Sequence, residues 1–200
     1  MFIWKKKNGC KWLTFFDFDK FLVIYPQNGK NINVQEFLNN ERYDKCKAIL
    51  VNWLMYNDNE LLHYDSRPLF VRFTQAENGN EQNRFTKPII RGYLKKNAFG
   101  YEKSDHYPGD DFIICDCTGK NIQGTDSIEP PVYEYAQITH FSTKSTEEYV
   151  NKIKRGYPNG KFPEPGGNVE LYFSHNQFTK EKLKIFEDAF NMKFEQFHLR

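Results

Sequence analysis

The sequence predicts an α/β protein, α+β in detail, in which a mixed sheet is accompanied by a few short helices. Two apolar runs, Trp12 to Ile24 and Ala48 to Tyr56, have the composition of strands. Capping signals at Asn33 and Ser145 each open a short helix. With 200 residues, of which 17% are aromatic, the chain can bury one sizeable core, so residues 1–200 are expected to form a single domain.

The first apolar run is interrupted by two carboxylates. Residues Trp12 to Phe16 indicate a strand buried on both faces, where a lone carboxylate would be costly to bury. Asp17 and Asp19 are therefore expected in the loop at the strand's carboxyl end, where open α/β sheets bind ligands. Because the two carboxylates are two positions apart, both can face one hard divalent cation, which phosphates commonly share. The alternative is that the acidic pair is only a turn signal.

A short helix and a central strand come next. Asn33 and Glu36 fit a capping box, and the helix they open is expected to reach about Arg42. The run Ala48 to Tyr56 has apolar side chains on both faces, which is typical of a strand at the centre of a sheet. One face carries Ile49, Val51, Trp53 and Met55, and the other carries Leu50, Leu54 and Tyr56.

The rest of the chain predicts short strands followed by helices. The helix capped at Ser145 is expected to end at Gly156, and a last amphipathic helix runs from Lys180 to about Met192. Between them, Tyr157 to Asn168 is rich in Pro and Gly and is expected to be irregular. The further strands are expected at Leu69 to Thr74, Pro88 to Tyr93, Phe112 to Cys115 and Tyr133 to Phe141.

Composition narrows the classes of protein. A formal net charge of +2 is nearly neutral, so it does not indicate a nucleic-acid partner. Because no stretch is long and apolar enough to span a bilayer and no signal peptide opens the chain, we expect a cytoplasmic protein without a transmembrane segment. The cysteines lack a Cys-x-x-Cys pair and are expected to be reduced thiols rather than zinc ligands: Cys10, Cys46, Cys115 and Cys117.

Two enzyme classes use an acidic pair after a strand. The first resemblance is to haloacid-dehalogenase-like phosphatases, in which the first Asp of Asp-x-Asp attacks phosphorus and the second is a general acid. Asp17 and Asp19 would take those roles, and Asp110 and Asp111 would imitate a later metal-binding motif. Phe21 departs from that family's pattern, which has Thr or Val at this position.

The second resemblance covers far more of the chain. Five segments follow one another in the order found in glycosyltransferases of the GT-A fold, especially the family 92 group and related bacterial family 2-like proteins. Lys11 to Leu22 is similar to that group's W-x-x-x-x-D-x-D-E-F block, and Ile138 to Gly156 resembles its H-Y-x-x-K-S-x-E-E-F ending. Between these two lie Lys47 to Tyr56, Arg67 to Thr74 and Lys87 to Ile90. The resemblance implies a partial GT-A-like mixed sheet.

This resemblance implies a metal-dependent transferase that moves a sugar from a nucleotide-sugar donor to a glycan or another hydroxyl acceptor. Mn²⁺ or Mg²⁺ on Asp17, Asp19 and His140 would bridge the donor's diphosphate and neutralise charge on the leaving nucleotide. Asp17 would face the donor's ribose or the metal's water shell, and Lys144 and Arg155 would help with phosphate charge. The alternatives are a structural role for His140 and a solvated helix face for Arg155.

The acceptor side is implied less directly. Trp53 would stack on an acceptor sugar, and the alternative for this residue is packing in the core. An inverting transferase needs a carboxylate base for the acceptor hydroxyl, and Asp110 and Asp111 are the candidates. The residues that compete with them are Asp58, Asp105 and His106.

Two departures from the family pattern bear on activity. Lys20 stands where the pattern has Glu, so its charge either weakens metal binding or points to solvent. In the family the acidic motif follows a long donor-binding half, whereas Asp17 lies close to Met1. The resemblance therefore implies the metal and acceptor half of a transferase without most of its donor half. The alternative is a catalytically inactive remnant that binds glycans or protein partners.

Overall fold

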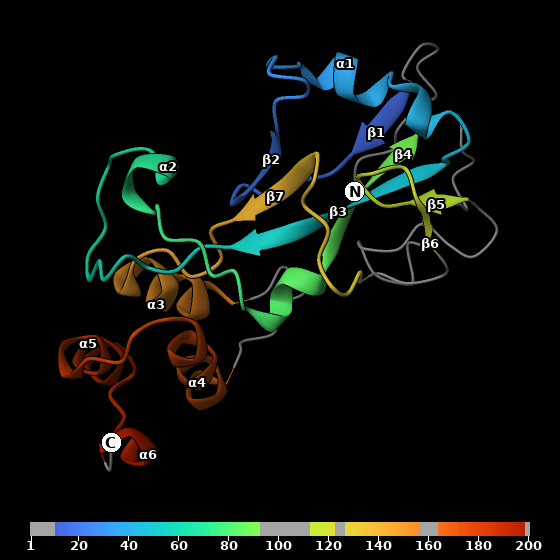
Figure 1. The fold of residues 1–200 in the computed structure, drawn as a ribbon. Helices are drawn as coiled ribbons and strands as arrows, with labels where there is room; N and C mark the ends of the chain where they lie inside the picture. The colour runs from blue at the N-terminus through green and yellow to red at the C-terminus, as the bar shows by residue number, and fades with distance from the viewer. Residues whose placement is uncertain (1–10, 93–112, 123–126, 157–163, 199–200) are drawn as a thin grey trace. The chain divides into compact units, whose positions relative to one another are not determined.

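The computed structural model describes residues 11–92, 113–122, 127–156 and 164–198 (Figure 1). These residues form a mixed sheet and several short helices, which confirms the predicted α/β class. The chain divides into two compact units, which are described separately, and the expectation of a single domain stays a prediction. Unit 1 comprises Met1–Leu54 and Glu81–His140, and unit 2 comprises Met55–Asn80 and Phe141–Arg200.

The sheet is built around β3 (Ala48–Met55). β3 pairs antiparallel with β4 (Thr86–Arg91) and parallel with β5 (Ile114–Cys115), so the sheet is mixed. β7 (Ala136–His140) also pairs with β3 and runs antiparallel to β2 (Lys20–Ile24), its neighbour in Figure 1. Among the described strands, β1 (Trp12–Thr14) pairs with β4 alone, β6 (Asn121–Ile122) with β5 alone, and β2 with β7 alone, so these three are outer strands.

β3 is central because both of its faces are apolar. All of its residues are buried, as the sequence predicted. On one face Ala48 and Leu50 pack in a core cluster with Ile90. Asn52 is tolerated in this strand because its side chain is fully hydrogen-bonded to backbone groups. Its amide nitrogen donates to carbonyls that include that of Ile128, and its oxygen accepts from the Val132 N–H, each at 3.1 Å.

β1 corrects the expectation of a strand buried on both faces through Phe16. The strand ends at Thr14, its residues are half-buried, and Phe15 is exposed. Within the described residues β1 pairs with β4 alone, so it lies at an edge of the sheet, where apolar side chains are not enclosed from both sides. Its Trp12 ring packs under the Arg91 guanidinium, 3.9 Å from the ring centroid.

The predicted helix after Asn33 is shorter than expected. Asn33 and Glu36 form the predicted capping box, but α1 (Val34–Leu38) does not reach Arg42. A second asparagine, Asn40, accepts a hydrogen bond from the Arg42 N–H at 3.2 Å and opens a separate 3-10 turn, η1 (Glu41–Tyr43). A local side-chain cap therefore competes with continuation of the helix. Unit 1 also contains the 3-10 turn η2 (Glu81–Arg84).

Unit 2 is helical, and it corrects two expectations. Leu69 to Thr74 is not a strand, because Leu69–Arg72 forms the short helix α2. Pro165 to Asn168 is not irregular, because Pro165 starts α4 at the first helical position, where proline's missing N–H has no cost; residues 157–163 lie outside the described residues. No described helix is long and apolar enough to cross a membrane. The remaining helices are α3 (Thr146–Arg155), α4 (Pro165–His175), α5 (Lys180–Phe190) and α6 (Glu195–His198).

An ion pair is enclosed within unit 2. The Asp58 carboxylate lies 2.6 Å from the Lys182 ammonium, and both side chains are almost fully buried. The Tyr172 hydroxyl donates to the same carboxylate at 2.5 Å, and Lys182 also donates to the Gln177 carbonyl at 2.9 Å. Because both charges are paired and hydrogen-bonded, they are tolerated in the interior. Asp58 is thus a structural anchor between the segment after β3 and α5.

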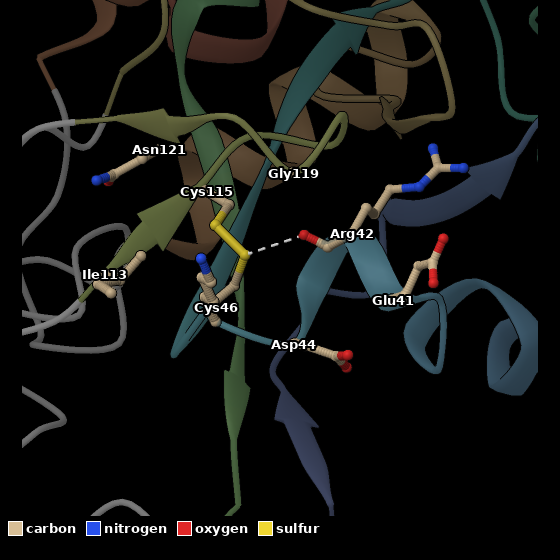
Figure 2. A pocket seen from close by; sticks show the side chains of 9 residues that line it. Glu41, Arg42, Asp44, Cys46, Ile113, Cys115, Gly119 and Asn121 are labelled. Carbon is tan, nitrogen blue, oxygen red and sulfur yellow. Dashed lines mark hydrogen bonds between the residues drawn. A yellow bond between two sulfur atoms is a disulfide. The ribbon is translucent and has the colours of Figure 1, made fainter.

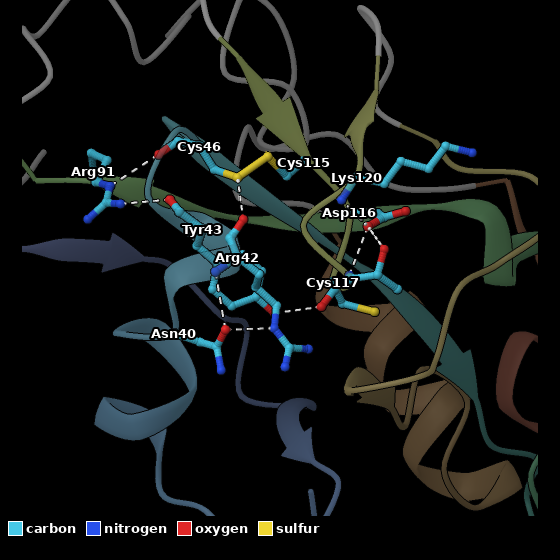
Figure 3. Close-up of a disulfide and its surroundings, with 10 residues drawn as sticks. Asn40, Arg42, Tyr43, Cys46, Arg91, Cys115, Asp116, Cys117 and Lys120 are labelled. Atoms are coloured by element: carbon cyan, nitrogen blue, oxygen red, sulfur yellow. Dashed lines mark hydrogen bonds between the residues drawn. A yellow bond between two sulfur atoms is a disulfide. The ribbon is translucent and has the colours of Figure 1, made fainter.

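A disulfide corrects the expectation of reduced cysteines. Cys46 precedes β3, Cys115 ends β5, and their sulfurs are bonded at 2.01 Å (Figure 3). These cysteines become neighbours because β3 and β5 pair side by side, a contact that spans 69 positions of sequence. Cys117 remains a free, buried thiol, and burial raises its pKa. Cys10 lies outside the described residues.

Candidate functional site

The acidic pair lies in the turn that joins β1 to β2. The Lys20 N–H donates to the Asp17 carbonyl at 3.0 Å, which closes this turn just before β2 begins. In the antiparallel pairing of β2 with β7, Lys20 stands opposite His140. Asp19, one position before Lys20, therefore has its Oδ1 3.8 Å from His140 Nε2. Two residues from opposite ends of unit 1 in sequence are brought together by one strand pairing.

Two buried lysines surround the acidic pair. Lys20 Nζ lies 2.6 Å from Asp17 Oδ2 and 3.7 Å from Asp19 Oδ1, and its side chain is 9% exposed. Lys87 projects from β4 with its Nζ 3.4 Å from Asp17 Oδ2, and its side chain is 5% exposed. Lysines this buried require a paired carboxylate. The site is thus a cluster of alternating charge rather than a purely acidic cavity.

The lysines keep Asp17 ionised. Partial burial alone would raise its pKa, but the hydrogen bond and charge of Lys20, together with the charge of Lys87, outweigh burial and lower the pKa from 3.8 to about 2. The Asp17 side chain is 59% exposed, so one side of this carboxylate still faces solvent. At neutral pH, Asp17 is a charged group that is oriented by its two lysines.

Asp19 has a different environment. Its Oδ1 is buried and makes no hydrogen bond, although Lys20 and His140 lie within 4 Å of it. A buried carboxylate oxygen without a hydrogen bond is a candidate ligand atom for a cation. Within the described ranges, no three or more His, Cys, Asp and Glu side chains converge as a metal site. The expected ligands Asp17, Asp19 and His140 do not converge as one set: Asp19 lies beside His140, whereas Asp17 is turned toward the lysines.

Trp53 forms one wall of this cluster. Its indole packs against the His140 ring with centroids 4.6 Å apart, and the Lys20 ammonium lies 4.9 Å from the indole centroid. Trp53 is 9% exposed and also packs against Phe85, as its core alternative predicts. A stacking role for Trp53 with an acceptor sugar stays a prediction. In this position the indole orients His140 and Lys20.

The other predicted site residues fall elsewhere. Lys144, half-buried, and Arg155, exposed, belong to unit 2, at the start and the end of the α3 region. Asp58 is enclosed by its ion pair with Lys182. The base candidates Asp110 and Asp111, with Asp105 and His106, lie outside the described residues.

Sequence reasoning gave Lys87 no role. It lies inside a strand between apolar and β-branched neighbours, and such a lysine needs an acidic partner because an unpaired ammonium is costly to bury. The sequence did not give that signal, because the strand was expected to begin at Pro88, one position after Lys87. Its partner, Asp17, could not be identified either, because the two residues meet only through the sheet.

A separate cavity of about 530 Å³ lies beside the disulfide. Figure 2 shows Cys46 and Cys115 on one side of it and the segment of Glu41, Arg42 and Asp44 on the other. Gly119 allows a close backbone approach here, since a Cβ on it would lie 2.7 Å from the Arg42 carbonyl oxygen. The cavity includes none of the residues of the acidic cluster.

Comparison with protein-family models, with curated proteins and with solved structures found no match for this chain. The resemblance to GT-A glycosyltransferases therefore stays a prediction. Function has to be inferred from the arrangement of Asp17, Asp19 and His140 and of the two lysines that face them.

Proposed function

We propose that the chain belongs to a metal-dependent glycosyltransferase that moves a sugar from a nucleotide-sugar donor to a glycan or another hydroxyl acceptor. The observation that supports this most is the pairing of β2 with β7, which sets Asp19 Oδ1 3.8 Å from His140 Nε2. The motif resemblance named both residues as metal ligands, and they lie 121 positions apart in sequence (140 − 19). Their approach agrees with that assignment.

In this proposal Asp19 and His140 hold Mn²⁺ or Mg²⁺, and the nearby Asp17 carboxylate adds a second negative charge that attracts the cation. A carboxylate and an imidazole are both suitable donors for these ions. When bound, the ion supplies Lewis-acid stabilisation to the diphosphate of the leaving nucleotide. Lys20 and Lys87 add positive charge near these residues, which would favour the phosphate oxygens of the donor.

Trp53 supports the proposed metal site by packing against its histidine, His140. Its ring packs against His140 and excludes solvent from one side of the imidazole. Because an imidazole that is held by packing loses little freedom on ligation, it binds a cation with less entropic cost. The base for the acceptor hydroxyl is not assigned, and Asp110 and Asp111 stay predictions.

The test is binding of a nucleoside diphosphate. We expect isothermal titration with UDP or GDP to give heat only when Mn²⁺ is present, and Asp19→Asn to weaken that binding at least about tenfold, since it removes a charged ligand. Asp44→Asn is the matched control, because it removes an exposed carboxylate of unit 1 that is not in the cluster.

The outcomes separate the alternatives. Absence of heat with either nucleotide, together with no effect of Asp19→Asn, would contradict the proposal. Nucleotide binding without donor hydrolysis or sugar transfer would indicate an inactive remnant. Turnover of an aryl phosphate with Mg²⁺ that is lost in Asp17→Asn would instead support the phosphatase alternative, in which Asp17 is the nucleophile.

A further inference from the structure

The Lys20 ammonium lies between the two carboxylates and contacts Asp19, one of the two residues proposed to hold the metal. This ammonium lies 2.6 Å from Asp17 Oδ2 and 3.7 Å from Asp19 Oδ1. The Lys20 side chain is 9% exposed, so it does not point to solvent. Of the two alternatives for this lysine, the one that agrees with its burial is that its charge weakens metal binding. Trp53 bounds the ammonium on another side, with its ring centroid at 4.9 Å.

The charges around Lys20 balance without an added ion. Two carboxylates, Asp17 and Asp19, lie beside two ammonium groups, those of Lys20 and Lys87, and His140 is a further titratable neighbour among the described residues. A divalent cation that entered this arrangement unchanged would meet two positive charges within a few ångströms. Repulsion at such distances in a partly buried site offsets much of the attraction of the carboxylates.

We propose that the Lys20 ammonium is a tethered cation that holds the Asp17–Asp19 pair when no divalent cation is bound, and that a divalent cation binds at Asp19 and His140 only by displacing it. This inference rests on the proposed function, because it concerns the same site. It gives Lys20 a positioning and regulatory role: it orients the two carboxylates, and it lowers the affinity of the site for the metal alone.

The displaced lysine also links the metal to the donor. Once released from the carboxylates, the ammonium needs another anion, and a nucleoside diphosphate brings one to the same place. The diphosphate therefore tightens binding of the cation, and by thermodynamic reciprocity the cation tightens binding of the diphosphate. The metal alone binds weakly, whereas metal and diphosphate together bind well.

The experiment measures Mn²⁺ affinity by isothermal titration, with and without UDP, in wild type, Lys20→Met and Lys20→Arg. Without nucleotide we expect Lys20→Met to bind Mn²⁺ about tenfold more tightly than wild type, because one positive charge near the site is removed. Lys20→Arg retains the charge and should bind as wild type does. UDP should enhance Mn²⁺ binding about tenfold less in Lys20→Met than in wild type, because the coupling through the ammonium is lost.

Two controls keep the result interpretable. Lys30→Met removes an exposed lysine of unit 1 and should leave Mn²⁺ affinity unchanged. Lys20→Gln, which keeps a polar end group, replaces Lys20→Met if thermal melting shows that the methionine variant does not fold. Added Mn²⁺ should also raise the melting temperature more in the charge-removing variant than in wild type, since tighter binding to the folded state stabilises it.

The possible failures are distinct. If wild type binds Mn²⁺ with UDP but Lys20→Met and Lys20→Gln bind Mn²⁺ no more tightly than wild type, the tethered-cation inference is overturned and the proposed function stands. If no variant binds Mn²⁺ even with UDP, both are overturned.

Discussion

Asp17 and Asp19 are two positions apart but have different physical surroundings. Asp17 is largely exposed and is paired with Lys20 and Lys87, whereas Asp19 is mostly buried and has an oxygen without a hydrogen bond. At the scale of single residues, therefore, an acidic motif does not imply two equivalent ligands. In the proposed function Asp19 is the ligand of the cation, whereas Asp17 is held by the two lysines.

The pKa of Asp17 gives a prediction about pH. In metal-free protein, an NMR titration of the Asp17 carboxyl should have its midpoint near 2, and Lys20→Met should move it back toward 3.8. Because the folded-state pKa is lowered, the ionised group contributes stability that is fully present above 3.8 and is lost as pH falls toward about 2. Solvent screening keeps this contribution below about 1 kcal/mol.

A comparison variant tests the cause of this shift. Lys30→Met removes an exposed lysine that does not contribute to the Asp17 shift, so it should leave the Asp17 midpoint in place. A midpoint near 3.8 in wild type would show that Lys20 and Lys87 do not hold the carboxylate.

At the scale of elements, local signals predicted best where the element is defined by its own residues. The capping box of Ser145 and Glu148 opens α3, and α5 begins at Lys180, as the amphipathic pattern indicated. β3 could be predicted from its apolar run alone. In contrast, the contiguous apolar residues of α2 predicted a strand, but Leu69–Arg72 forms a single helical turn in which Phe70 and Val71 are exposed.

The cap of α3 gives a stability prediction. Ser145 Oγ donates to Glu148 Oε2 at 2.8 Å and accepts from the Glu148 N–H at 3.3 Å, and Ser145 is fully buried. Ser145→Ala should lower the free energy of unfolding by about 1–2 kcal/mol, measured by urea denaturation. Ser174→Ala, which alters an exposed serine late in α4, should change it by less than about 0.5 kcal/mol. Equal effects of the two variants would show that the capping box does not stabilise α3.

At the scale of the whole molecule, the chain forms two units, and each unit is built from two separate stretches of the sequence. The disulfide from Cys46 to Cys115 belongs to unit 1, and the loop it closes contains the Met55–Asn80 segment of unit 2. A cross-link over 69 positions restricts the unfolded chain strongly.

Reduction should therefore destabilise unit 1. In the chain-entropy model, losing a cross-link over a loop of this length costs about 4 kcal/mol. The described tryptophans, Trp12 and Trp53, lie in unit 1, so their fluorescence should report an earlier urea midpoint when a reductant is added. The double variant Cys46→Ser/Cys115→Ser should unfold like the reduced protein and should not respond to reductant. Identical midpoints with and without reductant in wild type would show that the bond does not form.

The sequence by itself determined the α/β class, the central strand β3, the two capping boxes and the presence of an acidic pair at a strand end. Each of these depends on residues that are close together in the chain, where spacing and propensity carry the information. The edge position of β1, the disulfide, the approach of His140 to Asp19 and the burial of Lys20 and Lys87 were decided by tertiary structure. These features depend on which strands pair, and local sequence patterns do not predict contacts between distant segments of the chain.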